Sequence, residues 1–150
     1  MTVERDDGGS GRVVAMLTID LARRLRDEAG LAWDPERGDR FVVPDREMDD
    51  EVFVVSDFTV EVQQVPSGLV FGFNGTTEWA LDSLKVDQVL WLPREEELRE
   101  RLGPSFRRLE ATADGWAVVV AVLGEDGVDE GRHQDADVEC AYARAVLALA

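Results

Sequence analysis

The residue types best suited to hold a metal ion stand close together in the segment DREMDDE, residues 45–51. Carboxylate oxygens are the ligands that calcium and magnesium take in proteins, so the candidate metal ligands are Asp45, Glu47 and Asp49. The spacing does not match an EF-hand loop, because Asp50 stands where that loop needs glycine and Ser56 stands where it needs glutamate. We therefore interpret the segment as a solvated run of charges without a metal, and keep divalent-metal binding as the alternative.

The chain contains one histidine and one cysteine. His133 stands in an acidic stretch, residues 124–137, which is typical of a loop and suits an exposed histidine better than a catalytic base. Cys140 follows Glu139, and a neighbouring carboxylate raises the pKa of a thiol and disfavours a reactive thiolate. The phosphate-binding patterns GxxxxGKS/T and GxGxxG do not occur. We expect no catalytic residue and no cofactor. A carboxylate-dependent enzyme is the alternative, since 32 acids make chance carboxylate pairs frequent.

Two tryptophans lie near the two ends of residues 76–92, a segment whose apolar residues fit a strand, a short helix or both. An aromatic pair on irregular backbone commonly lines a groove for a peptide or a small molecule. The candidate ligand-binding or partner-binding residues are therefore Asn74, Thr76, Trp79 and Trp91. The alternative is that the tryptophans belong to the core or to its edge.

Acidity is the property in which the composition is most extreme. The chain has 32 acidic and 16 basic residues, a net charge of -16 at pH 7, and both halves carry the same excess of acids. Such a field repels the phosphates of nucleic acids, so we expect no direct binding to them. It attracts a basic protein partner and keeps the protein soluble.

The sequence has no recognisable membrane span, signal peptide or possible intramolecular disulfide. No run of about 18–20 apolar residues could cross a membrane, and the acidic N-terminus does not resemble a signal peptide. A single cysteine excludes an intramolecular disulfide and a multi-cysteine zinc site. We expect a cytoplasmic protein that does not bind membranes. Residues 1–15 are expected to form a disordered N-terminal extension, with Met16 as an alternative start, and residues 16–150 a single domain.

Two hairpins are predicted, and the first organises the rest of the chain. Across residues 58–79, apolar and polar side chains alternate with the period of a half-buried strand. Pro66-Ser67-Gly68 interrupts the alternation with turn residues. A second hairpin is predicted over residues 106–123, about the turn signal Asp114-Gly115.

Capping signals predict three helices around these hairpins. Thr18 suits the N-cap of a helix over residues 19–29, and Asp135 suits the cap of a helix over residues 136–149. Between them, a short helix is expected to have Pro93 at its first position. The sequence therefore predicts an α+β fold. Its mostly antiparallel sheet is built from two hairpins and flanked by an N-terminal, a short middle and a C-terminal helix.

The C-terminal helix is apolar on two sides. Its main stripe includes Val138 and Tyr142, and Cys140, Ala143 and Leu147 fall on nearly the opposite side at about 100° per residue. That second side is more apolar than an exposed face needs to be. We therefore predict either a homodimer contact through Cys140, Ala143 and Leu147, or a helix that is covered on both sides.

Five stretches across residues 16–150 carry a resemblance: FVVPD, MDDEVFVVSDFTVEV, FNGTTEWALDS, LWLPREEELRERLG and FRRLEATADGW. In these stretches the chain resembles a family of small acidic actinobacterial proteins, some of them labelled pilus-assembly proteins. The order of elements is more loosely similar to that of short phage and prophage proteins. The resemblance implies the fold and brings no catalytic residues. A pilus-assembly ATPase would need a phosphate loop, which this chain lacks.

These observations favour a protein without enzymatic activity that acts through contact with another protein. The uniform negative charge makes a basic partner the natural choice. The alternative is a binder of small ligands or divalent metals, or a carboxylate-dependent enzyme, that uses the Trp79/Trp91 region together with residues 45–51.

Overall fold

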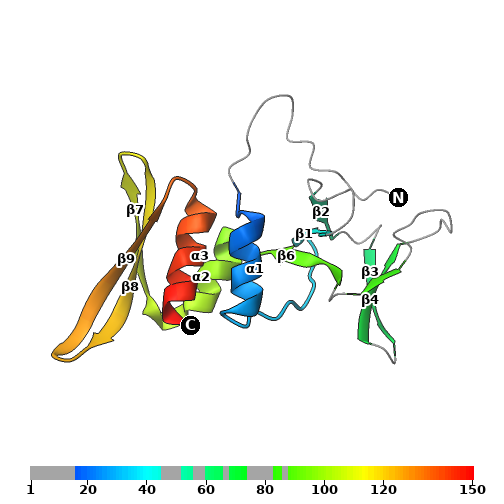
Figure 1. Cartoon of the computed structure of the whole chain (residues 1–150), viewed down its shortest axis with the longest axis horizontal. Coiled ribbons are helices and arrows are strands. Elements are labelled where there is room, and N and C mark those ends of the chain that lie inside the picture. The colour runs from blue at the N-terminus through cyan, green and yellow to red at the C-terminus, as the bar shows by residue number, and fades with distance from the viewer. Residues whose placement is uncertain (1–15, 45–51, 56–59, 66–67, 74–82, 86–87) are drawn as a thin grey trace. The chain divides into compact units, whose positions relative to one another are not determined.

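The structure, a computed structural model, describes residues 16–44, 52–55, 60–65, 68–73, 83–85 and 88–150. These residues form three α-helices and three antiparallel sheets of three strands each (Figure 1). The predicted α+β class with antiparallel sheets is confirmed. None of the helices in the described part of the chain is long and apolar enough to cross a membrane.

The described residues fall into two compact units, where the sequence predicts a single domain. One unit lies within residues 33–92, and the other combines residues 16–32 with residues 93–150. The two predicted hairpins form, but they belong to different sheets. In each of these two sheets the third strand follows the hairpin in the sequence. Residues 83–85 add a strand to the first hairpin, and residues 127–135 add one to the second.

One sheet of the first unit gathers aromatic side chains. In it, β1 (Arg40–Val42) lies between β2 (Phe53–Val54) and β6 (Leu90–Leu92), and both neighbours are antiparallel to it. Phe41 is opposite Phe53 on one side and opposite Trp91 on the other. The buried ring of Phe41 stacks on that of Phe53 with their centroids 5.5 Å apart. Burial of these rings stabilises a sheet whose strands are too short to be stable alone.

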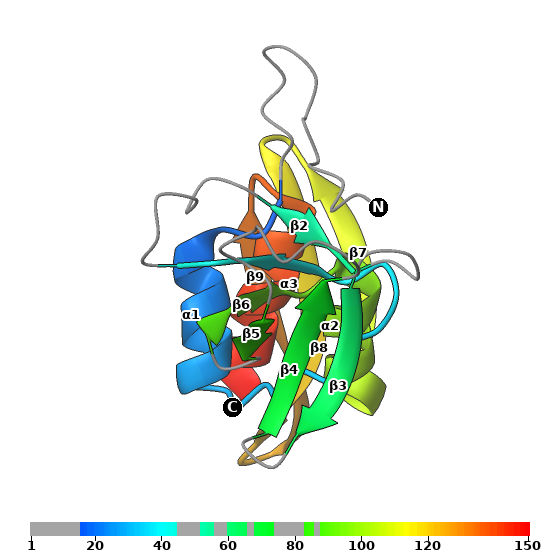
Figure 2. The ribbon, with the colours of Figure 1, turned by 90° about the vertical axis from the view of Figure 1, so that its right-hand side faces the viewer.

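The other sheet of this unit contains the first predicted hairpin. β3 (Val60–Val65) and β4 (Gly68–Phe73) pair antiparallel in an unbroken register (Figure 2). β5 (Ser83–Lys85) adds a third strand beside β4. The segment of residues 76–92 therefore contributes strands in its described residues, β5 here and β6 in the first sheet.

The second unit packs helices against the third sheet. Its elements are α1 (Ile19–Asp27), α2 (Glu95–Leu102), a 3₁₀ turn (Gly103–Ser105), β7 (Phe106–Thr112), β8 (Gly115–Gly124), β9 (Gly127–Asp135) and α3 (Val138–Leu149). β8 is the central strand of the sheet. α3 contacts β8 and β9 as well as α1 and α2, and it lies between the sheet and α1 (Figure 1).

The first two helices begin at side-chain caps. Thr18 Oγ1 accepts a hydrogen bond from the backbone N–H of Leu21 at 3.2 Å, as predicted for α1. Pro93 precedes α2 and does not occupy its first position, because Arg94 is the capping residue. The backbone N–H of Arg94 donates to Glu97 Oε1 at 3.1 Å, and the first helical residue is Glu95.

The cap of α3 also lies two residues after the predicted one. Asp137 Oδ1 accepts a hydrogen bond from the backbone N–H of Cys140 at 3.0 Å. Asp135 ends β9 instead, where its carboxylate accepts from the backbone N–H of Asp137 at 3.0 Å and from Arg144 Nε at 2.8 Å. Asp135 therefore supports the cap without being it.

The acidic stretch of residues 124–137 is largely a strand, and its prediction as a loop is wrong. β9 pairs with β8 without interruption from Gly127, opposite Gly124, to Asp135, opposite Trp116. The apolar alternation that marks a strand is missing, because β9 is at the edge of the sheet and carries charged residues on both faces.

Both faces of α3 are covered within the chain. One side packs on the sheet, where the ring of Tyr142 stacks on Phe106 with centroids 5.9 Å apart. On the other side Cys140 and Ala143 are 2% and 0% exposed, and Cys140 Sγ donates to the carbonyl oxygen of Met16 at 3.7 Å. Of the two predicted alternatives, a helix covered on both sides is the one that fits Cys140 and Ala143, because α1 and the segment preceding it lie on that face. Leu147 is partly exposed, and its role in a dimer contact stays a prediction.

Candidate interaction surface

The sheet β7–β8–β9 has an inner face that packs on α3 and an outer face that points away from it. Directly opposite residues of antiparallel strands share a face. Phe106 is opposite Val120, and Phe106 stacks on Tyr142 of α3, so Val120 lies on the inner face. Side chains alternate along a strand, which places Val119 on the outer face.

Small apolar residues of β8 lie between charged residues of the neighbouring strands on this outer face. Val119 is opposite Arg108 of β7 and opposite Arg132 of β9. Ala117 is opposite Glu110 of β7. Ala117 and Val119 are 0% and 1% exposed although α3 is on the other side of the sheet. The charged side chains of the two edge strands must therefore cover them.

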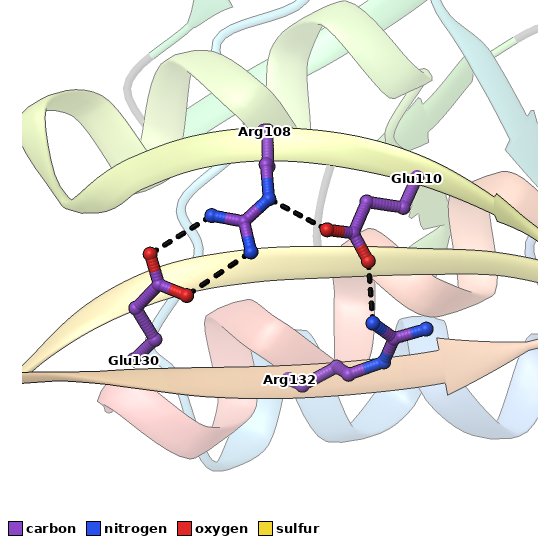
Figure 3. A network of polar contacts seen from close by, with 4 residues as sticks. All are labelled: Arg108, Glu110, Glu130 and Arg132. Atoms are coloured by element: carbon purple, nitrogen blue, oxygen red, sulfur yellow. Dashed lines mark hydrogen bonds and ion pairs between the residues drawn. The ribbon is translucent and has the colours of Figure 1, made fainter.

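Four of these charged side chains form a continuous chain of ion pairs (Figure 3). Arg108 donates through Nη1 and Nη2 to the two carboxylate oxygens of Glu130, at 2.8 and 3.1 Å. Its Nε donates to Glu110 Oε1 at 2.6 Å. The other oxygen of Glu110 accepts from Arg132 Nη1. The order Glu130–Arg108–Glu110–Arg132 thus reaches from β9 to β7 and back across β8, with no net charge of its own.

The ion pairs change the acidity of their carboxylates. The hydrogen bonds from Arg108 are the main reason that the pKa values of Glu110 and Glu130 lie below the ordinary value. The same bonds raise the pKa of Arg108. Pairs this exposed to solvent contribute little to stability one by one. Together they join the side chains of the two edge strands across β8.

The same outer face ends in two exposed apolar residues at the tip of the β8–β9 hairpin. Leu123 is opposite Val128, and the two are 92% and 63% exposed. The hairpin closes just beyond them with the two-residue turn Glu125-Asp126. A cross-strand apolar pair normally stabilises a sheet by being buried. Folding of this unit leaves the pair in water.

The other predicted site residues are only partly within the described part of the chain. Asn74, Thr76 and Trp79 lie outside it, as do Asp45, Glu47 and Asp49. Trp91 is described, and its ring stacks on that of Trp33 with centroids 6.2 Å apart and planes 7° apart. Trp33 in turn lies against the buried Phe41. Trp91 is thus at the edge of an aromatic core, the alternative that the sequence left open for it.

The histidine and the cysteine lie on different elements of the second unit, β9 and α3. His133 lies on β9 opposite Val118, and burial lowers its pKa. The pKa of Cys140 is raised to about 11, chiefly by burial. The direction of this shift is the predicted one, but its causes differ from the predicted effect of Glu139, because the carboxylates that add to burial are those of Asp137 and Asp135. Among the described residues, no group of three or more His, Cys, Asp or Glu side chains could hold a metal ion.

Comparison of the chain with protein-family models, with curated proteins and with solved structures finds no match. The resemblance to small acidic actinobacterial proteins therefore stays a prediction.

The residues of the outer face were missed in the sequence although a signal for them exists. Arg108 and Glu110 are two residues apart, and so are Glu130 and Arg132. Opposite charges at that spacing lie on the same face of a strand. The pattern was not informative on its own, because the second pair stands in a stretch whose many acids suggest a loop.

Proposed function

We propose that the protein has no enzymatic activity and acts by binding another protein through the outer face of the β8–β9 hairpin. The observation that carries the proposal is the exposed cross-strand pair of Leu123 and Val128. Two adjacent apolar side chains on a projecting hairpin fit a shallow apolar pocket on a partner.

The surroundings of this pair favour a basic partner. Glu125, Asp126 and Asp129 are exposed next to the two apolar residues. A partner with an apolar pocket and a rim of lysines or arginines complements this arrangement. The net charge of -16 accelerates the encounter with such a protein and repels acidic ones. Contact through the apolar pair then determines how long the complex lasts.

A capture experiment with matched variants tests the proposal. The tagged protein, a Leu123→Ser/Val128→Ser double variant and a Leu149→Ser control are incubated with lysate of the source cells at about 0.15 M salt. Leu149 is also an exposed apolar residue, but it lies on α3. We expect a basic protein that is retained by the wild type and by the control and is lost from the double variant. Equal retention by all three proteins, or no retained protein, would contradict the proposal.

A second candidate function is the binding of a small ligand next to Trp91. The indole nitrogen of Trp91 is buried and donates to no acceptor in the described part of the chain. A ligand oxygen could accept this hydrogen bond and relieve the cost of the unpaired group. A thermal-shift screen of metabolites, comparing the wild type with a Trp91→Phe variant, tests this function. Stabilisation that requires Trp91 would favour it, and an equal response of both proteins would exclude it.

A further inference from the structure

The outer side of β9 is a sheet edge that is open in the described part of the chain. β9 pairs with β8 alone, over nine residues and without a bulge. The other edge, β7, is shorter and has a register shift between Phe106 and Arg108. Bulges, prolines, short length and charged side chains are the usual means of preventing an edge from pairing with another chain. β9 has no bulge and no proline and is nine residues long, but it carries charged side chains. Its edge is therefore suited to accept a strand whose charges are opposite to its own.

The hairpin turn determines which backbone groups of β9 face this edge. Gly124 and Gly127 flank the hydrogen-bonded two-residue turn and are opposite each other, so they form a hydrogen-bonded pair of the ladder. Hydrogen-bonded and non-bonded pairs alternate along an antiparallel ladder. The odd-numbered residues of β9 therefore direct their N–H and C=O groups at β8, and the even-numbered residues direct theirs outwards. A second β9 in antiparallel orientation must place even residues opposite even residues.

Charge then selects one register among those that remain. If the pairing is centred on Gly131, Glu130 is opposite the partner's Arg132, and Arg132 is opposite the partner's Glu130. On the other face of the same strands, Asp129 is opposite the partner's His133. A register centred on Glu130 would place two glutamates opposite each other, and one centred on Arg132 would place two arginines opposite each other. Like charges in directly opposite positions destabilise a sheet.

We propose that the protein forms a twofold homodimer in which β9 pairs antiparallel with β9 of a second copy about Gly131. The two sheets join into one continuous sheet of six strands. This dimer does not depend on the proposed partner of Leu123 and Val128. It uses the edge of the hairpin, whereas that partner uses its face. A dimer would present the apolar pair twice, which increases avidity for any partner that is itself repeated.

The ion pairs of each copy are arranged to continue across the axis. Arg132 donates to Glu110 through Nη1 (Figure 3), and among the described residues this is its one side-chain hydrogen bond. Glu130 and Arg132 are both about half exposed, so they are accessible to a second chain. In the dimer, Glu110, Arg132, the partner's Glu130 and the partner's Arg108 form one continuous series of alternating charges. Gly131 at the axis has no side chain to hinder the approach of the two backbones.

Charge-reversal variants and light scattering test the dimer. At tens of micromolar protein and about 0.15 M salt, we expect the wild type to have about twice the monomer mass of 16.7 kDa. Glu130→Arg places arginine opposite arginine, and Arg132→Glu places glutamate opposite glutamate. Each variant should raise the dimer dissociation constant about tenfold or more. An equimolar mixture of the two variants restores both opposite-charge pairs, so it should form a dimer again.

A Gln134→Pro variant separates loss of pairing from loss of folding. Gln134 is an even-numbered residue, so its N–H faces the free edge and proline removes it without affecting the bonds to β8. We expect a monomer with the circular dichroism spectrum of the wild type. A monomeric wild type would overturn the proposal. So would a dimer that persists in Gln134→Pro and in both charge variants, because it would have to use another surface.

Discussion

Arg99 and Tyr142 are 43 residues apart in the chain, and Arg99 Nε donates to the Tyr142 hydroxyl at 3.1 Å. The guanidinium also lies 5.8 Å from the centre of the Tyr142 ring and 5.2 Å from that of Phe106. Arg99 is in α2, Tyr142 in α3 and Phe106 in β7. A single arginine thus connects three elements of the second unit, through one hydrogen bond and two cation–π contacts.

Substitution of this arginine should weaken the second unit. Arg99→Met keeps the apolar stem and removes the hydrogen bond and the cation–π contacts, so we expect a loss of about 1 kcal/mol in the free energy of unfolding. Urea unfolding followed by circular dichroism measures it. Glu100→Gln, at the exposed neighbouring position, is the control and should have little effect. Equal stability of the two variants would mean that the contacts are not formed in solution.

The carboxylates of the outer face should respond to removal of Arg108. Hydrogen bonds from Arg108 are the largest cause of the low pKa values of Glu110 and Glu130. Arg108→Gln should therefore raise both pKa values towards 4.5, the ordinary value, as followed by NMR titration of the side-chain carboxyl groups.

The sign of the pH effect on stability follows from the direction of these shifts. A carboxylate whose pKa is lower in the folded protein contributes stability above its unfolded pKa and loses that contribution as the pH falls. Wild-type stability should thus decline more steeply below pH 4.5 than that of Arg108→Gln. Arg24→Gln is the control, because Arg24 lowers the pKa of Glu28 on α1 instead. Identical titrations of Glu110 and Glu130 in both variants would contradict the arrangement in Figure 3.

The buried carboxylate of Asp39 should be required for the first unit. Its Oδ2 accepts from Trp33 Nε1 and from the backbone N–H of Glu36, both at 2.9 Å. Asp39→Ala leaves these donors without that acceptor, and we expect a loss of about 1–3 kcal/mol. Tryptophan fluorescence during urea unfolding reports on the change directly. Asp34→Ala, at an exposed position, serves as the control. A loss no larger than in the control would show that water replaces the carboxylate at no cost.

The thiol of Cys140 should make stability sensitive to alkaline pH. Its pKa rises from 9.0 to about 11 on folding, because burial disfavours the thiolate. The folded state thus holds the proton more tightly. The contribution is present below pH 9 and is lost as the pH approaches 11. Urea unfolding between pH 8 and pH 11 should show a steeper decline for the wild type than for Cys140→Ala. Parallel declines would mean that the thiol is not buried in solution.

Local signals were sufficient to predict the elements that depend on neighbouring residues. Thr18 forms the predicted cap. The hairpin predicted about Asp114-Gly115 joins β7 and β8, with Ala113-Asp114 as its turn and Gly115 as the first residue of β8. The caps of the other two helices, Arg94 and Asp137, each lie two residues after the predicted position. At these caps a carboxylate accepts from the backbone, Glu97 from the N–H of Arg94 and Asp137 from the N–H of Cys140.

Features that depend on distant residues were beyond the sequence pattern. β9 has no apolar stripe, since Glu130 and Arg132 on its outer face form ion pairs with residues of β7 that stand 22 positions earlier in the chain. The second apolar side of α3 was recognised, but its cover could not be identified. That cover is α1, whose approach brings Met16 to Cys140 across 124 residues. No periodicity within either helix contains this information.

The separation of α1 from α3 also has a consequence for the order in which the chain folds during synthesis. The apolar side of α1, formed by Leu21, Ala22 and Leu25, leaves the ribosome long before the helix that buries it. At about 5–20 residues per second, the nascent chain exposes this side for roughly ten seconds. The first unit is translated completely in that interval. The second unit can complete its fold only after α3 has been translated. Until then the exposed apolar side of α1 is a surface to which a chaperone could bind.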